Sequence, residues 1–232
     1  MSEAKQPFTG VIVYERLRRA ILEQALLPGT RLREDAIGEQ FGVSRTIVRQ
    51  ALVRLESEHL VETQRNRGAC VAEPTLIEAE QIFEIRHCLE AEVIRRLIDR
   101  ISVIGLESLD AHVDQEARVQ GKNGPVSIRL AGEFHILLAE LTGNRILAGY
   151  VSELVTRCSL ILAMYSRSHS SDCAVEEHRD IIQAVRDKDI KVALSIMDHH
   201  LGAVQGRANL SGDQKEDNLQ SVLARYSEDP SA

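Results

Sequence analysis

Composition and charge already narrow the class of protein. The chain has 232 residues, 44% of them hydrophobic and 27% charged, and these values exclude disordered and collagen-like proteins. Aromatic residues make up 3% and tryptophan is absent, which favours helices packed by aliphatic side chains over a β-sandwich. The longest apolar stretch, Leu160 to Tyr165, is far shorter than the roughly 18 residues of a membrane span, and a signal-peptide pattern is missing. We therefore expect a mainly α-helical, cytoplasmic protein with no membrane contact and with reduced cysteines.

The charges are distributed unevenly along the chain. The formal net charge is −7, but residues 1–75 hold 11 Lys and Arg against 10 Asp and Glu, whereas residues 76–232 hold 17 against 25. All but one of the basic residues in the first segment are arginines, the side chain best suited to forked contacts with phosphate and guanine. This asymmetry indicates that only the N-terminal part meets a polyanion.

The N-terminal 73 residues show the pattern of a winged helix-turn-helix. Apolar residues at four-residue steps predict a first helix that ends before Pro28 and Gly29. Gly42 lies in the turn between two further short helices, and Ser44 is placed as the N-cap of the second of them. Two extended runs around a basic tip at 65–68 then form the wing. The predicted helices and strands cover residues 10–26, 33–41, 45–59, 60–64 and 69–72.

The third helix has one apolar face and one polar face. At 100° per residue, its polar arc collects Arg45, Thr46, Arg49 and Gln50. Arginine and glutamine read guanine and adenine edges in the major groove, and a helix N-terminus favours a phosphate. A solvated arginine face on an ordinary bundle helix is the alternative. The short preceding helix, the glycine turn and the basic wing together favour recognition of double-stranded DNA.

The rest of the chain is predicted to be a helical bundle. Pro74 marks the boundary, because the residue before a proline avoids helical geometry. The predicted helices cover residues 76–100, 106–120, 126–142, 144–166, 173–187 and 190–208. We therefore expect one domain over 1–73, an all-helical domain of about six or seven helices over 74–211, and a polar tail over 212–232. In the tail, Leu219, Val222, Leu223 and Tyr226 form an apolar stripe, which predicts a short docked helix, with a frayed terminus as the alternative.

Three of the eight histidines lie mid-helix on three different predicted helices. His135, His178 and His200 all have apolar neighbours, and three imidazoles that converge inside a bundle can hold a divalent metal ion. His199 is rotated by about 100° from His200 and should face solvent. No short spacing motif connects the three histidines, so three separate buried or surface side chains remain the alternative.

The N-terminal motifs resemble the DNA-binding half of the GntR family of bacterial repressors. The residues that carry the resemblance are Pro28 to Leu32, Phe41 to Thr46, Val48 to Leu52, Arg54 to Glu56, Leu60-Val61, Arg67-Gly68 and Val71. The resemblance implies that Arg45 and Arg49, beside Gln50, read bases and phosphates, that Thr46 contacts the DNA backbone, and that Gly68, next to Arg67, enters the minor groove. It also implies a homodimer on a short inverted-repeat operator.

The second part resembles the FCD ligand-binding domain of the FadR-like subgroup, over about residues 76–208. The residues that carry this resemblance are Phe134-His135, Thr142 to Asn144, Glu177 to Arg179 with Ala184, and His200-Leu201. It implies a divalent metal, zinc or alternatively nickel, on His135, His178 and His200, with a small carboxylate effector beside it. Metal-binding members have an Asp one helical turn before the first histidine, where this chain has Ala131. We expect water or an effector carboxylate to fill that position.

Three further residues are candidates for binding the effector. Arg86 and Glu90 match an Arg-x-x-x-Glu segment on the first helix of the FCD domain, and Arg86 is interpreted as gripping the effector carboxylate. Arg129 and Asn144 are weaker candidates. The alternative for Arg86 is an i,i+4 ion pair on a surface helix, worth about 0.3–0.5 kcal/mol.

The leading hypothesis is a dimeric, ligand-responsive transcription regulator, a repressor and not an enzyme. Two alternatives stay open: a metal-dependent enzyme that uses the open three-His site, and a helical dimerisation module without metal. The first 75 residues favour the regulator, since an enzyme would not need them.

Overall fold

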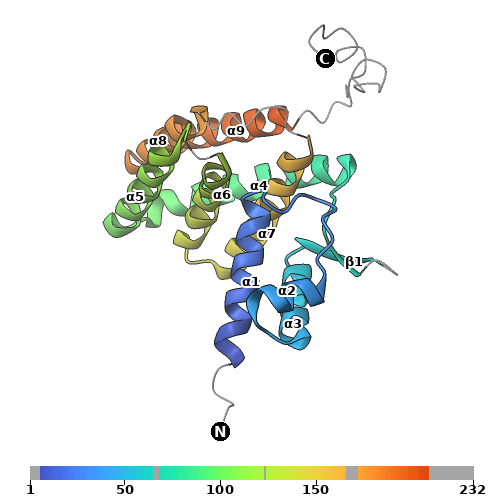
Figure 1. Cartoon of the computed structure of the whole chain (residues 1–232). Helices are drawn as coiled ribbons and strands as arrows, with labels where there is room; N and C mark the ends of the chain where they lie inside the picture. Colours follow the sequence, from blue (N-terminus) through green and yellow to red (C-terminus); the bar gives the residue numbers. More distant parts are fainter. Residues whose placement is uncertain (1–5, 65–67, 123, 166–171, 209–232) are drawn as a thin grey trace, which may run out of the picture.

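The computed structural model describes residues 6–64, 68–122, 124–165 and 172–208. These residues form nine helices and one two-stranded sheet, arranged as a small N-terminal part, here called the head, and a larger helical part, here called the body (Figure 1). The predicted class, a winged helix-turn-helix followed by a helical bundle, is confirmed. The predicted tail helix over residues 218–227 lies outside the described residues.

The head contains three helices and the two strands of the wing. Each predicted element is present, with shifts of a few residues at the ends. The bounds are α1 Gln6–Leu22, α2 Glu34–Phe41, α3 Arg45–Ser57, β1 Val61–Gln64 and β2 Gly68–Val71. The largest shift concerns α1, which begins four residues before and ends four residues before the predicted helix.

Local chemistry sets the turn between α2 and α3. Gly42 adopts a left-handed backbone with φ of 65° and ends α2, a conformation that costs glycine little. Ser44 then accepts a hydrogen bond from the backbone N–H of Ile47 and caps α3. The N-terminus of α3 is thereby fixed against α2, and its first residues are presented to solvent.

The wing is an antiparallel hairpin. Its register pairs Val61 with Val71 and Gln64 with Gly68, and Arg31 adds an isolated bridge to Cys70. Gly68 has a φ of 77°, so the hairpin turns back into β2 through a residue without a side chain.

The body is a bundle of six helices among the described residues. Their bounds are α4 Leu76–Arg100, α5 Val103–Val119, α6 Gly124–Leu141, α7 Arg145–Tyr165, α8 Asp172–Arg186 and α9 Ile190–Arg207. Thr75 and Glu78 form a capping box at the start of α4, and Asp189 caps α9. Helix α5 begins three residues before the predicted start because Ser102 supplies its N-cap.

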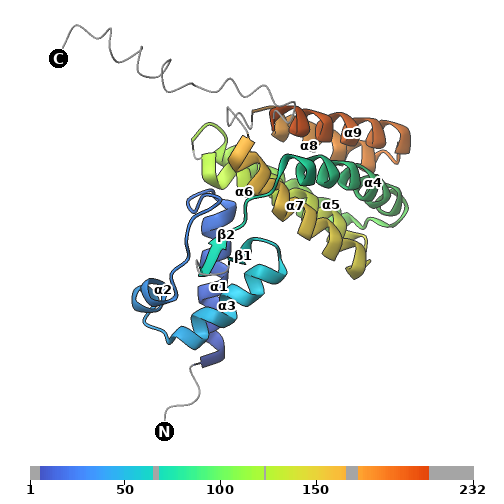
Figure 2. The same ribbon diagram turned by 90° about the vertical axis from the view of Figure 1, so that its right-hand side faces the viewer.

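Head and body have their own apolar clusters, and they also contact each other. The head cluster is built on α1, α3 and the wing, but it includes Leu160 of α7. Figures 1 and 2 show α1 running along the head up to the body, where it contacts α6 and α7. Arg18 donates to Thr156 of α7 at 3.4 Å, and His59, which follows α3, lies 3.3 Å from Glu153 of α7. The head is thus attached to the body by side chains.

Helix α7 bears on the prediction that no segment spans a membrane. Over Arg145–Tyr165 it is long and apolar enough to cross a membrane by length and composition, with a mean hydropathy of 1.5, whereas the search for an uninterrupted apolar run found none. The helix packs against α4 and α6 and reaches the head. A core helix of a soluble protein passes the same test, so this composition alone is weak evidence for a membrane span.

Candidate functional sites

The polar face of α3 is exposed, as the pattern predicted. Arg45, Thr46, Arg49 and Gln50 are all exposed, whereas the opposite face is buried in the head core through Val48, Ala51, Leu52 and Leu55. The four polar residues come from the first two turns, so their side chains gather near the N-terminus of the helix. This end carries free backbone N–H groups and a partial positive charge, and both attract a phosphate.

Arg49 has an acidic partner on the preceding helix. Its Nε donates to Oε1 of Glu34 at 3.0 Å, and its Nη2 donates to Oε2 at 2.8 Å. These hydrogen bonds hold the pKa of Glu34 below its ordinary value. Glu34 is the first residue of α2, so the two helices of the helix-turn-helix are joined by a forked ion pair at the surface expected to face DNA.

The wing residues are only partly described. Gly68 is exposed at the start of β2, on the hairpin that extends from the head (Figure 1). Arg67, the predicted arginine of the wing tip, lies outside the described residues.

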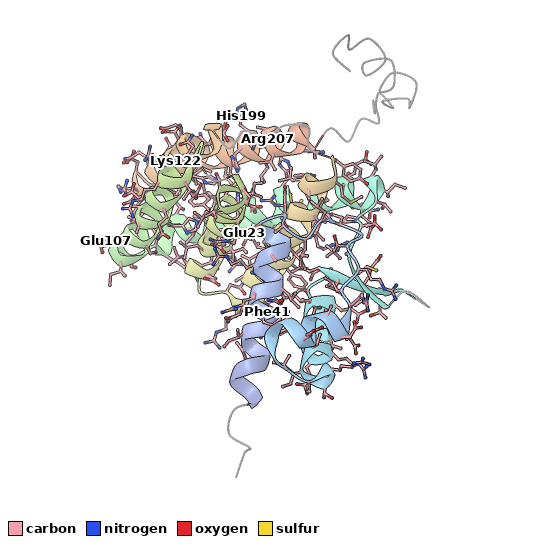
Figure 3. The ribbon with its side chains drawn as sticks, viewed as in Figure 1. Glu23, Phe41, Glu107, Lys122, His199 and Arg207 are labelled. Atoms are coloured by element: carbon pink, nitrogen blue, oxygen red, sulfur yellow. The ribbon has the colours of Figure 1, made fainter. Side chains whose placement is uncertain are left out.

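The three predicted histidines come together inside the body. His135 on α6, His178 on α8 and His200 on α9 are all buried, and one nitrogen atom from each lies within 4.8 Å of the others. Nε2 of His135 is 3.2 Å from Nε2 of His200. His199 is exposed, as predicted, and Figure 3 shows it on the outer side of α9.

A separate carboxylate holds the Nδ1 atom of each histidine. The distances are 2.5 Å from His135 to Glu90 of α4, 3.0 Å from His178 to Glu116 of α5, and 2.6 Å from His200 to Glu177 of α8. A carboxylate on one ring nitrogen fixes the orientation of the ring and leaves the other nitrogen for a metal ion. The histidines and their carboxylates together involve α4, α5, α6, α8 and α9.

The charges around the histidines determine which nitrogen atoms carry protons. Burial alone would raise the pKa of Glu90, but the charge of Arg86 and the hydrogen bonds from His135 and Arg86 outweigh it and hold that pKa well below its ordinary value. The hydrogen bond from His200 lowers the pKa of Glu177, whereas burial raises the pKa of Glu116 to about 7. Burial lowers the pKa of His135 to about 3. We therefore assign a neutral ring to His135, with its proton on Nδ1 and the lone pair of Nε2 directed at His200.

The spacing between Nε2 of His135 and Nε2 of His200 suits two ligands of one cation. Glu177 accepts a hydrogen bond from Nδ1–H of His200, so the lone pairs of the two Nε2 atoms face each other at 3.2 Å unless a proton or a cation lies between them. Ligand nitrogens of a tetrahedral zinc ion lie about 3.3 Å apart when each zinc–nitrogen bond is about 2.0–2.1 Å. Nε2 of His178 is buried and has no hydrogen-bond partner among the described residues, a costly state that a metal ion would relieve. The ring of His178 is held in place by stacking on Phe134, with 3.9 Å between the centroids.

Arg86 lies in the interior and not on a surface helix. Its Nε donates to Glu90 at 2.7 Å and its Nη1 to Sγ of Cys158 at 3.2 Å, and its side chain is 4% exposed. The i,i+4 ion pair of the alternative interpretation is present, but its expected place on a surface helix is wrong, because both side chains are buried. Glu90 contacts both Arg86 and His135. The guanidinium of Arg86 is therefore linked to the histidine cluster through one carboxylate. Nη2 is buried without a partner among the described residues.

The other two effector candidates have different partners. Arg129 donates through Nε to Glu23 at 2.9 Å and through Nη1 to Glu133 at 2.8 Å, and Glu23 lies where α1 meets the body (Figure 3). The side-chain oxygen of Asn144 accepts hydrogen bonds from the backbone N–H groups of Ile146 and Leu147, which caps α7. These contacts give no support to an effector role for Arg129 or Asn144.

Four acidic residues at these sites were missed or misread in the sequence. Glu177 precedes His178 in the sequence and Glu90 was noted only as the partner of Arg86, but their histidine partners, His200 and His135, are 23 and 45 residues away. Glu116 and Glu34 gave no signal, because their partners His178 and Arg49 are 62 and 15 residues away in the sequence.

Comparisons with known proteins address both parts of the chain. The family model for bacterial regulatory proteins of the gntR family matches residues 10–71, and the model for the FCD domain matches residues 81–203. The transcriptional regulator LutR of Bacillus subtilis is 30% identical over 201 residues, which cover 78% of this chain and 92% of that protein. The HTH-type transcriptional repressor RspR of Escherichia coli is 26% identical over 192 residues, which cover 82% and 84%.

Solved structures agree with the fold. The E. coli protein McbR/YncC superposes with a TM-score of 0.75 at 22% identity, covering 88% of this chain and 97% of that one. A GntR-type regulator from Rhodococcus sp. RHA1 gives a TM-score of 0.74 at 20% identity, covering 86% and 96%. At these identities the likeness shows the fold alone.

Proposed function

The chain belongs to the gntR family of bacterial transcription regulators and carries an FCD domain, and on this premise we propose that it is a metal-dependent, ligand-responsive repressor. Residues 1–73 would bind DNA as one half of a homodimer in the cytoplasm, and residues 74–211 would mediate dimerisation and bind a divalent metal and a small carboxylate. The observation that carries the metal and ligand part is the convergence of three buried histidines, with one ring nitrogen of each within 4.8 Å of the others and a carboxylate on each Nδ1.

DNA recognition is proposed to follow the exposed face of α3. Arg45, Arg49 and Gln50 would contact base edges and phosphates in the major groove, and Thr46 would contact the backbone. Arg67 and Gly68 of the wing would approach the adjacent minor groove. The alternative of a solvated arginine face is disfavoured because the matched gntR model spans α3 and the wing.

The first test is selection of the operator from a library. The full-length chain should recover from randomised duplexes a short sequence with twofold symmetry, because a homodimer presents one head to each half-site. Sequencing after several rounds, followed by fluorescence anisotropy with the recovered duplex, measures this. Recovery of no sequence above a scrambled background would contradict the DNA-binding assignment.

The metal is proposed to be zinc, with nickel as the alternative, on His135, His178 and His200. When bound, such an ion supplies a positive charge and an open coordination position to an oxygen ligand. Ala131 stands one turn before His135 and offers no side-chain ligand, so water or the carboxylate of an effector would complete the coordination. The chain's own contribution is to hold three buried rings, each by a carboxylate on Nδ1, with one nitrogen of each ring within 4.8 Å of the others.

The effector is proposed to be a small carboxylate near Arg86. The guanidinium of Arg86 already pairs with Glu90. The N–H groups on Nη2 of Arg86 are buried and have no hydrogen-bond partner among the described residues. A carboxylate that reached both the metal and Nη2 would satisfy the open position and the unpaired donor together. Mass spectrometry of the small molecules that copurify with the chain would identify it, and an uncharged ligand would contradict the carboxylate assignment.

Helix α6 provides a direct route from this centre to the head. It carries His135 and, six residues earlier, Arg129, which contacts Glu23 at the end of α1. The side chains of this pair are only 19% and 16% exposed, so solvent screens them less than an ordinary surface pair. A change in the position of α6 would therefore be transmitted to α1, which packs on α3.

Replacing Arg129 by alanine should loosen this connection. We expect backbone amides over residues 20–30 to exchange faster with solvent, by roughly tenfold or less, since a single pair of this kind contributes about 1 kcal/mol. Hydrogen-exchange mass spectrometry of the full chain measures this. Arg186→Ala, which removes an ion pair to Asp110 between α5 and α8, is the matched control and should leave residues 20–30 unchanged. Equal exchange in both variants would contradict the proposed route.

The two alternative functions receive less support. For an enzyme, a general base would be needed beside the metal, but Glu90, Glu116 and Glu177 are each engaged with a histidine Nδ1. The family models and named relatives are transcription regulators. A purely structural module would not explain why Nε2 of His178 is buried without a hydrogen-bond partner among the described residues.

A further inference from the structure

The forked pair between Glu34 and Arg49 crosses the helix-turn-helix at the surface proposed to read DNA. The two hydrogen bonds have lengths of 3.0 and 2.8 Å, and the side chains of Glu34 and Arg49 are 31% and 68% exposed. Glu34 is the first residue of α2, and Arg49 is the fifth residue of α3. Glu34 places a negative charge beside Arg49, the arginine proposed to read a base. This placement needs an explanation, because DNA repels a negative charge.

The geometry of the pair leaves one edge of the guanidinium available. A guanidinium can donate two parallel hydrogen bonds from its side edge, Nε with Nη2, or from its end, Nη1 with Nη2. Glu34 occupies the side edge. Nη1 and the second hydrogen of Nη2 have no partner among the described residues, and the end of Arg49 therefore remains free. Two parallel donors at that end match O6 and N7 of guanine.

We propose that Glu34 is a specificity-determining positioning residue, which fixes Arg49 so that the free end of its guanidinium meets guanine in the major groove. The inference rests on the proposed function, in which α3 reads the operator. An unrestrained arginine has four rotatable bonds and loses rotamer freedom when it binds. Glu34 restricts that freedom in the free protein, so less is lost on binding to the correct base.

If Glu34 acted only through its charge, its removal would strengthen DNA binding, which is the opposite of what positioning of Arg49 predicts. Removing an acidic residue near DNA strengthens binding to every sequence, since it reduces repulsion from phosphates. Positioning of Arg49 changes binding only where a guanine is present at the right place. The ratio of affinities for a selected operator and a scrambled duplex therefore separates the two effects.

The decisive variant is Glu34→Gln, with Asp35→Asn as its control. Asp35 is the next residue in the first turn of α2 and pairs with Arg33, not with α3. Its substitution therefore removes one negative charge from the same turn as Glu34 without changing the partner of Arg49. Both changes should raise affinity for the scrambled duplex to a similar extent. Glu34→Gln should also lower the ratio of operator to scrambled affinity by about 3- to 10-fold, because Arg49 must then be ordered on binding. Asp35→Asn should leave that ratio within about twofold.

The measurement uses the full-length chain, the operator recovered by selection, and fluorescence anisotropy at one salt concentration. Circular dichroism and thermal melting confirm that each variant is folded. In an Arg49→Ala background, Glu34→Gln should lower the ratio no further. A Glu34→Gln ratio that is unchanged or raised would overturn the positioning role. If Arg49→Ala itself leaves operator affinity unchanged, the assignment of α3 in the proposed function fails, and the two failures are thus distinguishable.

Discussion

Replacing His178 by alanine is expected to abolish the gain in thermal stability that zinc gives to the wild-type chain. A ligand that binds only the folded state stabilises it by about 4.1 kcal/mol when its free concentration is 1,000 times Kd. For a chain of 150–250 residues, 1 kcal/mol shifts Tm by about 2–4 °C. The wild type should therefore melt about 8–16 °C higher with zinc than after treatment with a chelator, and the variant should show almost none of this difference.

The zinc-dependent difference in Tm is measured, and not Tm itself, for a structural reason. His178 is fully buried against Phe134, so alanine leaves a cavity that lowers Tm with or without metal. His199→Ala is the matched control, since His199 is the exposed neighbour of His200 and should keep the full difference. A His178→Ala variant that gains as much from zinc as the wild type would contradict the proposed ligand set.

Replacing Arg49 by alanine should weaken operator binding by roughly 5- to 150-fold, the range expected for losing one forked contact with guanine. Affinity for a scrambled duplex should fall much less. The loss has two sources, because the substitution removes a donor and also leaves Glu34 without its partner near DNA. The double variant Glu34→Gln/Arg49→Ala separates them, since it removes the stranded charge as well.

A control for overall charge lies on the body. Arg100 is exposed in the last turn of α4, and Arg100→Ala removes one positive charge far from α3 in the sequence. Anisotropy titrations at one salt concentration should show operator affinity within about twofold of the wild type for this control. Equal losses in Arg49→Ala and Arg100→Ala would mean that Arg49 acts through net charge and not by reading a base.

The helices could be predicted because their signals are local. Apolar periodicity and N-caps such as Ser44 and Asp189 lie within a few residues of the ends that they set. The predicted span 76–100 matches α4 at both ends. The start of α1 was missed, because residues 6–9 lack the apolar spacing that defined the rest of the helix.

The histidines were found from the sequence, but their supports were not. Placement on three helices with apolar neighbours indicated that the rings could meet, and tertiary packing brought them together. The pairing of Glu116 with His178 depends on how α5 packs on α8, which no local spacing encodes. The contacts of Arg129 and Asn144 were not predicted for the same reason, since the ion pair with Glu23 and the capping of α7 depend on neighbours that the resemblance did not specify.

Anomalous diffraction from crystals of the full-length chain grown with zinc tests the central claim most directly. The account predicts one anomalous peak at the zinc edge in each body, bounded by Nε2 of His135, His178 and His200 at about 2.0–2.1 Å. It also predicts that Glu90, Glu116 and Glu177 lie on the Nδ1 atoms, as in the present structure. The absence of a peak among the three histidines, or a peak held by Nδ1 atoms or by other residues, would contradict it.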